Sequence, residues 1–450
     1  MIVLNKKVSK IVAIGCGVGI ITANLMPVYA NDNTSSINKV DNSIVNDSTK
    51  RTSEKEILTV REAVRAALKN SDKLKMKSEE IKMLKEKLEV QDELDSFTKS
   101  DNSFPYEQMG LLKNQSEQAK EFMEDQIAND ITNKYNDLVS RENELDKMKN
   151  NLEIKTKEIK DMKLKKELGL VTSLETKSAE LELQTLQNTQ KAKLQELKNN
   201  QDYFKLLTNV DLNNYQLDKE YRFESFRVGG SVDSYMEGKV NEYLKYDQLI
   251  LERTEESFND KDENKADLPD RPELKKPTVP PKPIKPSLDK FSTQEAYIKA
   301  LDEYNKKLDE YENAINALNQ YNAEKTNYAT GLTTYANYLQ QKYNTENGLV
   351  TLEDSKKALK KGLIDSYAQL LALEDTIEIT KKQLELSEKQ VKNTKLRYDL
   401  GLITLTDYKK QVVSNEDAKN SYDTLIVNYN SLKNGIEKPW ILSTGNNTGK

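Results

Sequence analysis

The sequence predicts an all-α fold: two repeats of a long antiparallel helical hairpin, with little or no β structure. Three observations support this fold class. Charged residues make up 32% of the 450-residue chain, whereas glycine (15) and proline (10), which interrupt helices, are scarce. Apolar residues recur at 3-, 4- and 7-residue steps over long stretches, as they do on one face of a helix. The sequence Leu-Gly-Leu occurs twice, and each time it ends such a stretch.

Each Leu-Gly-Leu sequence is expected to form the turn of a hairpin. Gly169 and Gly401 follow long helical patterns, and glycine accepts the left-handed conformation that ends a helix. We expect Leu170, with Val171 or Ile403, to close the turn by packing. The predicted turn residues of the two repeats are Leu168, Gly169, Leu170, Thr172 and Glu175, and Leu400, Gly401, Leu402, Thr404 and Asp407.

Threonines and acidic residues are placed to start the returning helices. Thr172 and Thr404 suit the N-cap position, because a threonine hydroxyl accepts a hydrogen bond from a free backbone N–H. Glu175 and Asp407 follow at the third position after them, which is the spacing of a capping box. Each hairpin is therefore expected to reverse tightly, with the ends of both its helices capped.

The N-terminal segment, 1–30, has the pattern of a secretory signal peptide. Lys6, Lys7 and Lys10 precede an apolar stretch that ends at Val28-Tyr29-Ala30 and is followed by polar residues. A membrane anchor and lipid attachment at Cys16 are the alternatives. Cys16 is the only cysteine, so the processed chain would have neither a disulfide nor a cysteine-based metal site. We therefore expect an exported, extracytoplasmic protein of the cell envelope.

An insertion interrupts the second repeat. Seven of the ten prolines lie between Pro269 and Pro286, which predicts a stiff polyproline II linker or a recognition site for an aromatic groove. The heptad pattern that follows predicts a coiled coil, which either packs on a neighbouring helix of the same chain or joins copies of the chain. The apolar positions of this heptad are Tyr297, Leu301, Tyr304, Leu308, Tyr311, Ile315 and Leu318.

The two hairpins are in register when Gly169 is placed on Gly401, and we call this superposition of the sequence on itself the repeat alignment. In the repeat alignment Leu152 meets Leu384, so the hairpins are copies of one unit. The expected segments are a signal peptide (1–30), a flexible lead-in (31–55), a first repeat (56–228), a second repeat (229–258 and 346–436), a Pro-rich linker (259–291), a helical coiled-coil insertion (292–345) and a flexible tail (437–450).

The composition argues against enzymatic and nucleic-acid functions. Histidine, the commonest general base and transition-metal ligand, is absent. The net charge is −5 with no dominant basic patch, so nucleic acid is not an expected partner. Paired acids such as Glu79 and Glu80 are expected on solvated helix faces. No P-loop, zinc spacing or calcium loop occurs, and we predict no catalytic residue, no metal and no cofactor.

The opening helix and the turns together resemble the TolC family of outer membrane efflux proteins. Residues 57–70 resemble the Leu-Thr-x-x-Glu-Ala opening of a family repeat, and residues 397–407 resemble the family turn. The first turn keeps Gly169 but has Lys165-Lys166 and Glu175 where the family pattern has arginine, tyrosine and aspartate. The resemblance covers residues 56–256 and 345–436.

This resemblance implies a homo-oligomer, a trimer, whose hairpins form a helical duct. The turns would lie at the tip, where family proteins meet a membrane-fusion adaptor and an ABC or other exporter. Tip acids such as Asp407 would line the aperture and attract cations. The alternative is a structural or interaction coiled-coil protein of the envelope that transports nothing.

The sequence departs from the family where a membrane barrel is expected. Transmembrane strands need about 9–11 residues of alternating apolar character, and neither connection between the helices offers them. We therefore expect a divergent member that lacks the barrel strands and lies at a Gram-positive-like surface or wall. An outer-membrane location would apply if a barrel existed.

Overall fold

The computed structural model describes residues 55–99, 103–259 and 270–442. The expected signal peptide (1–30), almost all of the lead-in (31–55) and the end of the tail lie outside these residues. The chain divides into two compact units. One unit contains Glu54–Asp267 and Thr345–Lys450, which include both hairpins. The other contains Leu268–Asn344, which hold the proline-rich segment and the heptad.

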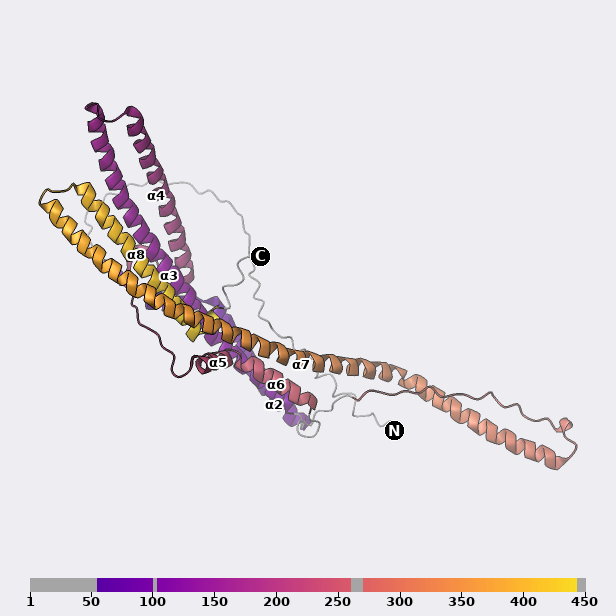
Figure 1. Ribbon diagram of the computed structural model, residues 1–450. Coiled ribbons are helices and arrows are strands. Elements are labelled where there is room, and N and C mark those ends of the chain that lie inside the picture. The colour runs from indigo at the N-terminus through magenta and orange to yellow at the C-terminus, as the bar shows by residue number, and fades with distance from the viewer. Residues whose placement is uncertain (1–54, 100–102, 260–269, 443–450) are drawn as a thin grey trace, which may run out of the picture. The chain divides into compact units, whose positions relative to one another are not determined.

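Long helices dominate the described residues, as the sequence predicts (Figure 1). The α-helices, β-strands and short 3-10 helices (η) follow one another along the chain in this order: β1 (Glu56–Leu58), α1 (Val60–Asn70), α2 (Asp72–Thr98), α3 (Phe104–Glu167), α4 (Ser173–Thr208), η2 (Leu212–Asn214), β2 (Tyr215–Leu217), α5 (Val232–Tyr243), α6 (Lys245–Asn259), η3 (Leu288–Lys290), α7 (Gln294–Asp399) and α8 (Leu405–Glu437). Helices α3 and α4 form one hairpin, and the end of α7 forms the other with α8.

The first described helix, α1, begins at a side-chain cap and ends at Ser71, whose own hydroxyl caps the next helix. The Thr59 hydroxyl accepts the Glu62 N–H at 3.3 Å, and the Glu62 carboxylate accepts the Thr59 N–H at 2.9 Å, which is a complete capping box. The sequence predicts one helix through this region, but Ser71 divides it. Its backbone is extended (ψ 112°) and its hydroxyl caps α2 by accepting the Leu74 N–H. Serine favours such caps over helix interiors.

Helix α3 begins earlier than the sequence predicts. Pro105 and Gly110 predict a break in the chain, followed by a helix that starts near Ser116. In the structure α3 starts at Phe104, with Pro105 in its first turn. Proline fits there because its missing N–H has no partner in the first turn of a helix. Gly110 lies within the helix.

Two short strands, too short to show a strand pattern in the sequence, join the ends of the first repeat. β1 and β2 pair in parallel, with Ile57 opposite Gln216. Tyr135 of α3 lies behind them, and its hydroxyl donates to the Leu58 carbonyl at 2.6 Å. The same oxygen accepts the Asp218 N–H at 2.7 Å. This buried tyrosine therefore ties the hairpin to both strands, and burial raises its pKa above the ordinary range.

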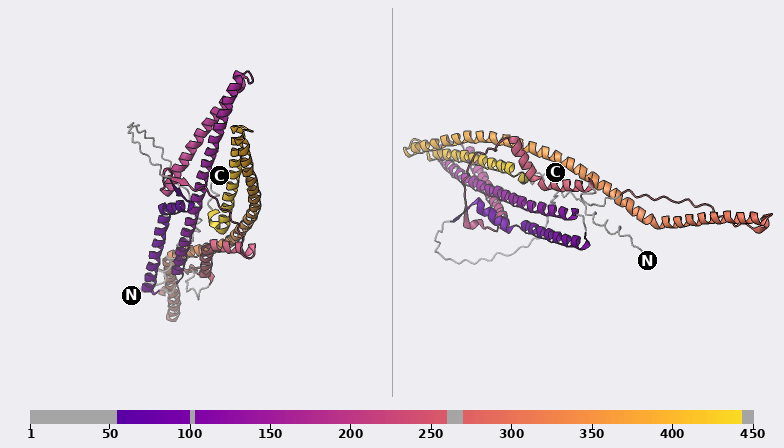
Figure 2. Two further views of the ribbon diagram at one scale, coloured as in Figure 1. Left: turned by 90° about the vertical axis from the view of Figure 1, so that its left-hand side faces the viewer. Right: turned by 90° about the horizontal axis from the view of Figure 1, so that it is seen from below.

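The repeat extends into the hydrophobic cores. Three buried residues of α3 in the first core have buried counterparts on α7 in the second core, each in the repeat alignment. The pairs are Ile131 with Leu363, Tyr135 with Tyr367, and Leu138 with Leu370. Equivalent positions thus perform the same packing in both hairpins, and both hairpins point their turns toward the same end of the unit (Figures 1 and 2).

The last described residues are packed, where the sequence predicts a flexible tail. Trp440 is 5% exposed and stacks on Phe122 of α3, with ring centroids 4.2 Å apart. Its indole N–H donates to Asp125 at 2.9 Å, and Lys438 donates to the same carboxylate at 2.5 Å. The beginning of the tail therefore packs on the first repeat.

The second unit pairs a proline-rich segment with the beginning of α7. A Cβ built on Gly331 would lie 3.2 Å from the ring of Pro272, and the Phe291 and Tyr297 rings lie 5.8 Å apart. Figures 1 and 2 show the segment running back along the helix. Half-buried residues recur at every third position of the segment: Leu274, Pro277, Pro280, Pro283 and Pro286. The residues of the tyrosine heptad are half-buried within this unit, and the coiled coil expected there stays a prediction.

Candidate functional site at the hairpin turns

The first turn is built by the backbone of Gly169. Its φ of 72° is left-handed, the conformation glycine adopts without steric cost. This lets the Leu170 N–H donate to the Lys165 carbonyl and the Gly169 N–H donate to the Lys166 carbonyl, both at 2.9 Å. The pattern is a Schellman motif, which satisfies carbonyls that the end of α3 would otherwise leave free.

The second turn repeats this geometry. Gly401 also has a φ of 72°. The Leu402 N–H donates to the Arg397 carbonyl and the Gly401 N–H donates to the Tyr398 carbonyl, both at 2.8 Å. The Tyr398 ring stacks on Tyr408 of α8 at a centroid distance of 5.7 Å. Two turns far apart in the sequence therefore have one structure.

Both returning helices begin with a complete capping box. At α4 the Thr172 hydroxyl accepts the Glu175 N–H at 3.2 Å, and the Glu175 carboxylate accepts the Thr172 N–H at 2.8 Å. At α8, Thr404 and Asp407 make the same two bonds at 3.1 Å each. Hydrogen bonds from Thr172 lower the pKa of Glu175, and those from Thr404 lower the pKa of Asp407. Both acids are therefore ionised well below neutral pH.

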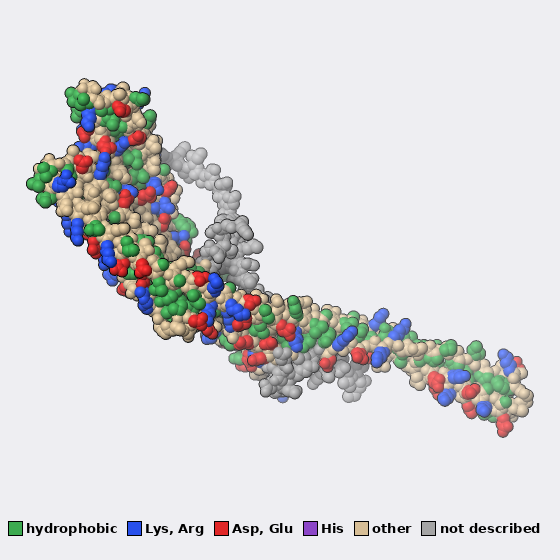
Figure 3. Space-filling view, in the orientation of Figure 1, with side chains coloured by type: hydrophobic (Ala, Val, Ile, Leu, Met, Phe, Trp, Pro, Cys, Tyr) green, Lys and Arg blue, Asp and Glu red, His purple; other side chains and the backbone are tan. Residues whose placement is uncertain are grey.

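The turns expose leucines to solvent. Leu168 and Leu170 are 73% and 72% exposed, and Leu400 and Leu402 are 65% and 66% exposed. The prediction that Leu170 closes its turn by packing is wrong, because the caps and the Schellman bonds hold the turn without it. Figure 3 shows hydrophobic side chains gathered at both hairpin ends. Each turn thus presents a small apolar surface on a rigid support.

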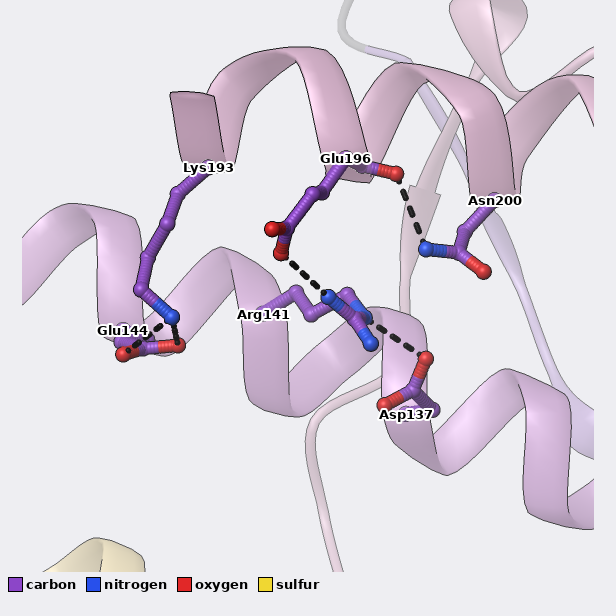
Figure 4. Close-up of polar contacts among 6 residues, drawn as sticks. All are labelled: Asp137, Arg141, Glu144, Lys193, Glu196 and Asn200. Carbon is purple, nitrogen blue, oxygen red and sulfur yellow. Dashed lines mark hydrogen bonds and ion pairs between the residues drawn. The ribbon is translucent and has the colours of Figure 1, made fainter. Parts of the chain in front are cut away.

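Ion pairs between its two helices stiffen the first hairpin. Arg141 on α3 donates to Asp137 on its own helix at 2.7 Å and to Glu196 on α4 at 3.1 Å (Figure 4). One turn further on, Lys193 of α4 pairs with Glu144 of α3 at 2.8 Å. These pairs are partly exposed, so each contributes little stability, but together they fix the register of the two helices.

A second set of polar contacts joins the two hairpins, and we call this contact the α3–α8 seam. Its pairs are Lys147 with Asp417, Asn150 with Glu416, Glu153 with Lys409 and Glu158 with Lys410. The Lys410–Glu158 pair is 2.6 Å long. The apolar periodicity of the helices does not reveal this seam. The sequence signal for it is a match of charges: basic and acidic residues on the predicted α3 helix face oppositely charged residues on α8 when the two helices are aligned antiparallel.

The described residues give no sign of a metal centre or a membrane-spanning helix. No cluster of His, Cys, Asp and Glu side chains among them is arranged to hold a metal ion. In the same residues, no helix has an apolar stretch long enough to cross a bilayer.

Comparisons with known proteins support the fold. No family model and no curated protein sequence matches the chain. Among solved structures, the chain is similar to CusC, whose structures are described in connection with folding and transmembrane channel formation. The two share 10% sequence identity and a TM-score of 0.50, over 85% of this chain and 91% of CusC.

Two further structures have comparable coverage. A membrane protein from Pseudomonas aeruginosa has the same TM-score and identity, over 85% of this chain and 92% of its own. The CmeC outer membrane channel from Campylobacter jejuni is 14% identical over 91% and 94% of the two chains, but its TM-score is 0.39. At these identities the first two matches establish the fold alone. The described part of the chain is almost entirely helical, with two packed helical hairpins, and its fold is similar to that of CusC.

Proposed function

We propose that this chain is an extracytoplasmic component of an export machine, and not an enzyme. Several copies, three by resemblance to the TolC family, would place their hairpins side by side around a duct. The turns would dock on a membrane-fusion adaptor and, through it, on an ABC or other exporter. The observation that carries the proposal is the structural similarity to CusC over 85% of this chain and 91% of CusC.

The geometry of the turns supports docking at the tips. Each hairpin ends in a short turn fixed by backbone hydrogen bonds, with leucines exposed on its surface. Exposed apolar groups on a rigid support are typical of protein interaction sites. Glu175 and Asp407 add one negative charge each beside these leucines.

The experiment that tests the duct is a measurement of mass and shape. Light scattering on the purified chain is expected to give three times the mass of one chain, and electron microscopy is expected to show a central lumen between the hairpins. A monomer, or a dimer without a lumen, would exclude the duct.

The second unit favours a different candidate, a structural or interaction protein of the envelope. Its proline segment and helix form a stiff rod, because polyproline II and α-helix each resist bending. Nothing in this rod is needed to build a duct from the hairpins. An assembly without a lumen, combined with loss of cell-surface integrity when residues 268–344 are removed, would favour this candidate.

A further inference from the structure

The most exposed large apolar side chain among the described residues lies in the second unit, near the point where its chain reverses. Ile284 is 91% exposed, although the neighbouring Pro283 is half-buried. Leu288 and Ile298 are 61% and 51% exposed. All three lie close in sequence to the reversal, where η3 joins the proline segment to α7 (Figures 1 and 2). We call residues 282–299 the rod end.

The reversal is held by other groups. Phe291 and Tyr297 are half-buried, and their rings lie 5.8 Å apart. The Thr293 hydroxyl accepts the Ala296 N–H at 3.3 Å and so caps the beginning of α7. The Phe291 N–H donates to the Leu288 carbonyl at 3.3 Å, so Leu288 contributes its backbone to the turn while its side chain stays exposed. The exposed apolar side chains of the rod end therefore remain available for contact with another surface.

This exposure is confined to the rod end within the described part of the unit. Every leucine, isoleucine and tyrosine of α7 between Ile298 and Leu339 is half-buried. Leu339 and Tyr343 are 48% and 62% exposed, but they lie roughly 60 Å further along α7. The side of the rod therefore covers its apolar residues, and the rod end does not.

Lysines accompany the exposed apolar residues. The rod end has four lysines and two acids, whereas the whole chain has a net charge of −5. Each of the three exposed apolar residues has a lysine one or two positions away in the sequence. All four lysines are exposed, and none forms an ion pair among the residues that the structure describes. They are Lys282, Lys285, Lys290 and Lys299.

Apolar side chains among unpaired lysines match the chemistry of an anionic lipid surface. The apolar groups leave water by entering the headgroup region, and the ammonium groups stay beside the lipid phosphates. The long lysine stem lets the charge remain there while its methylene groups contact apolar surface. A protein partner would need a groove shaped to the convex end of a rod, whereas a lipid surface adapts to it.

We propose that the rod end binds the surface of a membrane that contains anionic lipids. Ile284, Leu288 and Ile298 enter the headgroup region, and the four lysines contact lipid phosphates. The contact is superficial, because side chains of this size reach only the boundary between headgroups and acyl chains. The inference does not rest on the proposed duct, since the rod end belongs to the second unit.

Flotation with lipid vesicles tests this contact. The protein used is the chain of residues 31–450, because the apolar stretch of the expected signal peptide would itself bind lipid. It is expected to float with vesicles of phosphatidylglycerol and phosphatidylcholine in equal parts, and much less with phosphatidylcholine alone. Ile284→Ser with Leu288→Ser is expected to weaken binding about tenfold or more. Lys282→Gln with Lys285→Gln is expected to weaken it about fivefold for each lysine removed.

The same unit offers matched controls. Leu339→Ser with Tyr343→Ser removes two exposed apolar side chains away from the rod end, and Lys306→Gln with Lys307→Gln removes two exposed lysines. Both control variants are expected to bind vesicles as the parent chain does. All the substituted side chains are exposed, so circular dichroism is expected to show the same helix content in every variant.

The outcomes are separable from those for the duct. No flotation with anionic vesicles, or equal flotation with phosphatidylcholine alone, would overturn the inference whatever the mass of the assembly. Equal losses in the control variants and the rod-end variants would also overturn it. If the rod-end variants changed the mass measured by light scattering without lipid and left flotation unchanged, the rod end would be a contact between copies and not a lipid site.

Discussion

Replacing Gly401 with alanine should destabilise the second hairpin by about 1 kcal/mol. A Cβ at this position would meet no atom within 4 Å, so no steric clash contributes. The whole cost comes from the backbone, because φ is 72° and an L-residue pays about 1–2 kcal/mol in the left-handed region. Alanine also has fewer backbone conformations than glycine in the unfolded chain, and this lower entropy offsets part of the destabilisation.

Gly362 provides the matched control. It lies in α7, and a Cβ there would also meet nothing within 4 Å. Its backbone is helical, however, so Gly362→Ala should stabilise the protein by about 0.5–1 kcal/mol. The two substitutions add the same methyl group to open space, and only the backbone conformation differs between them.

The assay is urea unfolding followed by circular dichroism at 222 nm, with both variants measured beside the parent chain. Gly401→Ala should lower the midpoint and Gly362→Ala should raise it. A midpoint that rises for Gly401→Ala would refute the left-handed turn, and with it the hydrogen bonds that Gly401 and Leu402 donate to the end of α7.

Three further predictions concern other contacts. Hydrogen bonds from Thr404 lower the pKa of Asp407, so this stabilisation is present above the unfolded value of ~3.9 and is lost as the pH falls through the lower folded value. Thr404→Ala should cost about 1 kcal/mol and flatten that acid dependence in urea unfolding between about pH 2 and pH 5. Tyr135→Phe should cost about 0.5–1.5 kcal/mol in the same assay, because it removes the hydrogen bonds of the buried hydroxyl to the Leu58 carbonyl and the Asp218 N–H, while the Asp218 N–H keeps its 3.2 Å bond to the Leu58 carbonyl. Trp440, the only tryptophan, should emit as a buried indole, and a solvent-like emission maximum in the native protein would contradict its stacking on the first repeat.

Features encoded within a few residues could be predicted from the sequence. The positions of both glycine turns and both capping boxes depend only on local backbone chemistry, so two short sequences were sufficient to place them. The helical repeat was also visible, because the apolar spacing persists over many turns. The break at Ser71 was missed although it is local, since serine occurs both at caps and on exposed helix faces.

Contacts between distant segments could not be predicted in the same way. The β1–β2 pair joins the beginning of the first repeat to the chain that follows its hairpin, and such short strands carry too little periodicity to be recognised. The α3–α8 seam depends on the register of two helices, which no single helix encodes.

The heptad pattern alone does not identify what packs on the tyrosine stripe, for a geometric reason. A polyproline II helix repeats a face every three residues, or about 9 Å, and a heptad repeats every seven residues, or about 10 Å. A proline face can therefore follow a heptad stripe nearly in step. The heptad pattern predicts a rod-like partner, and it does not distinguish a second α-helix from a polyproline segment such as the one that contains Pro272.

The acids at the turns have a structural role that limits what else they can do. One oxygen of Asp407 accepts both the backbone N–H and the hydroxyl of Thr404, and one oxygen of Glu175 accepts the same two groups of Thr172. The capping box therefore fixes each carboxylate but uses only one of its oxygens. The charge remains at the surface, because both groups are exposed and their pKa values are lowered. A capping acid can thus hold the turn closed and, in an assembly of several copies, contribute to a ring of negative charge at the tips. The same carboxylate caps the helix and carries the charge. A variant that removes the charge and changes transport would therefore identify the charge as the cause only if the turn stayed intact in that variant.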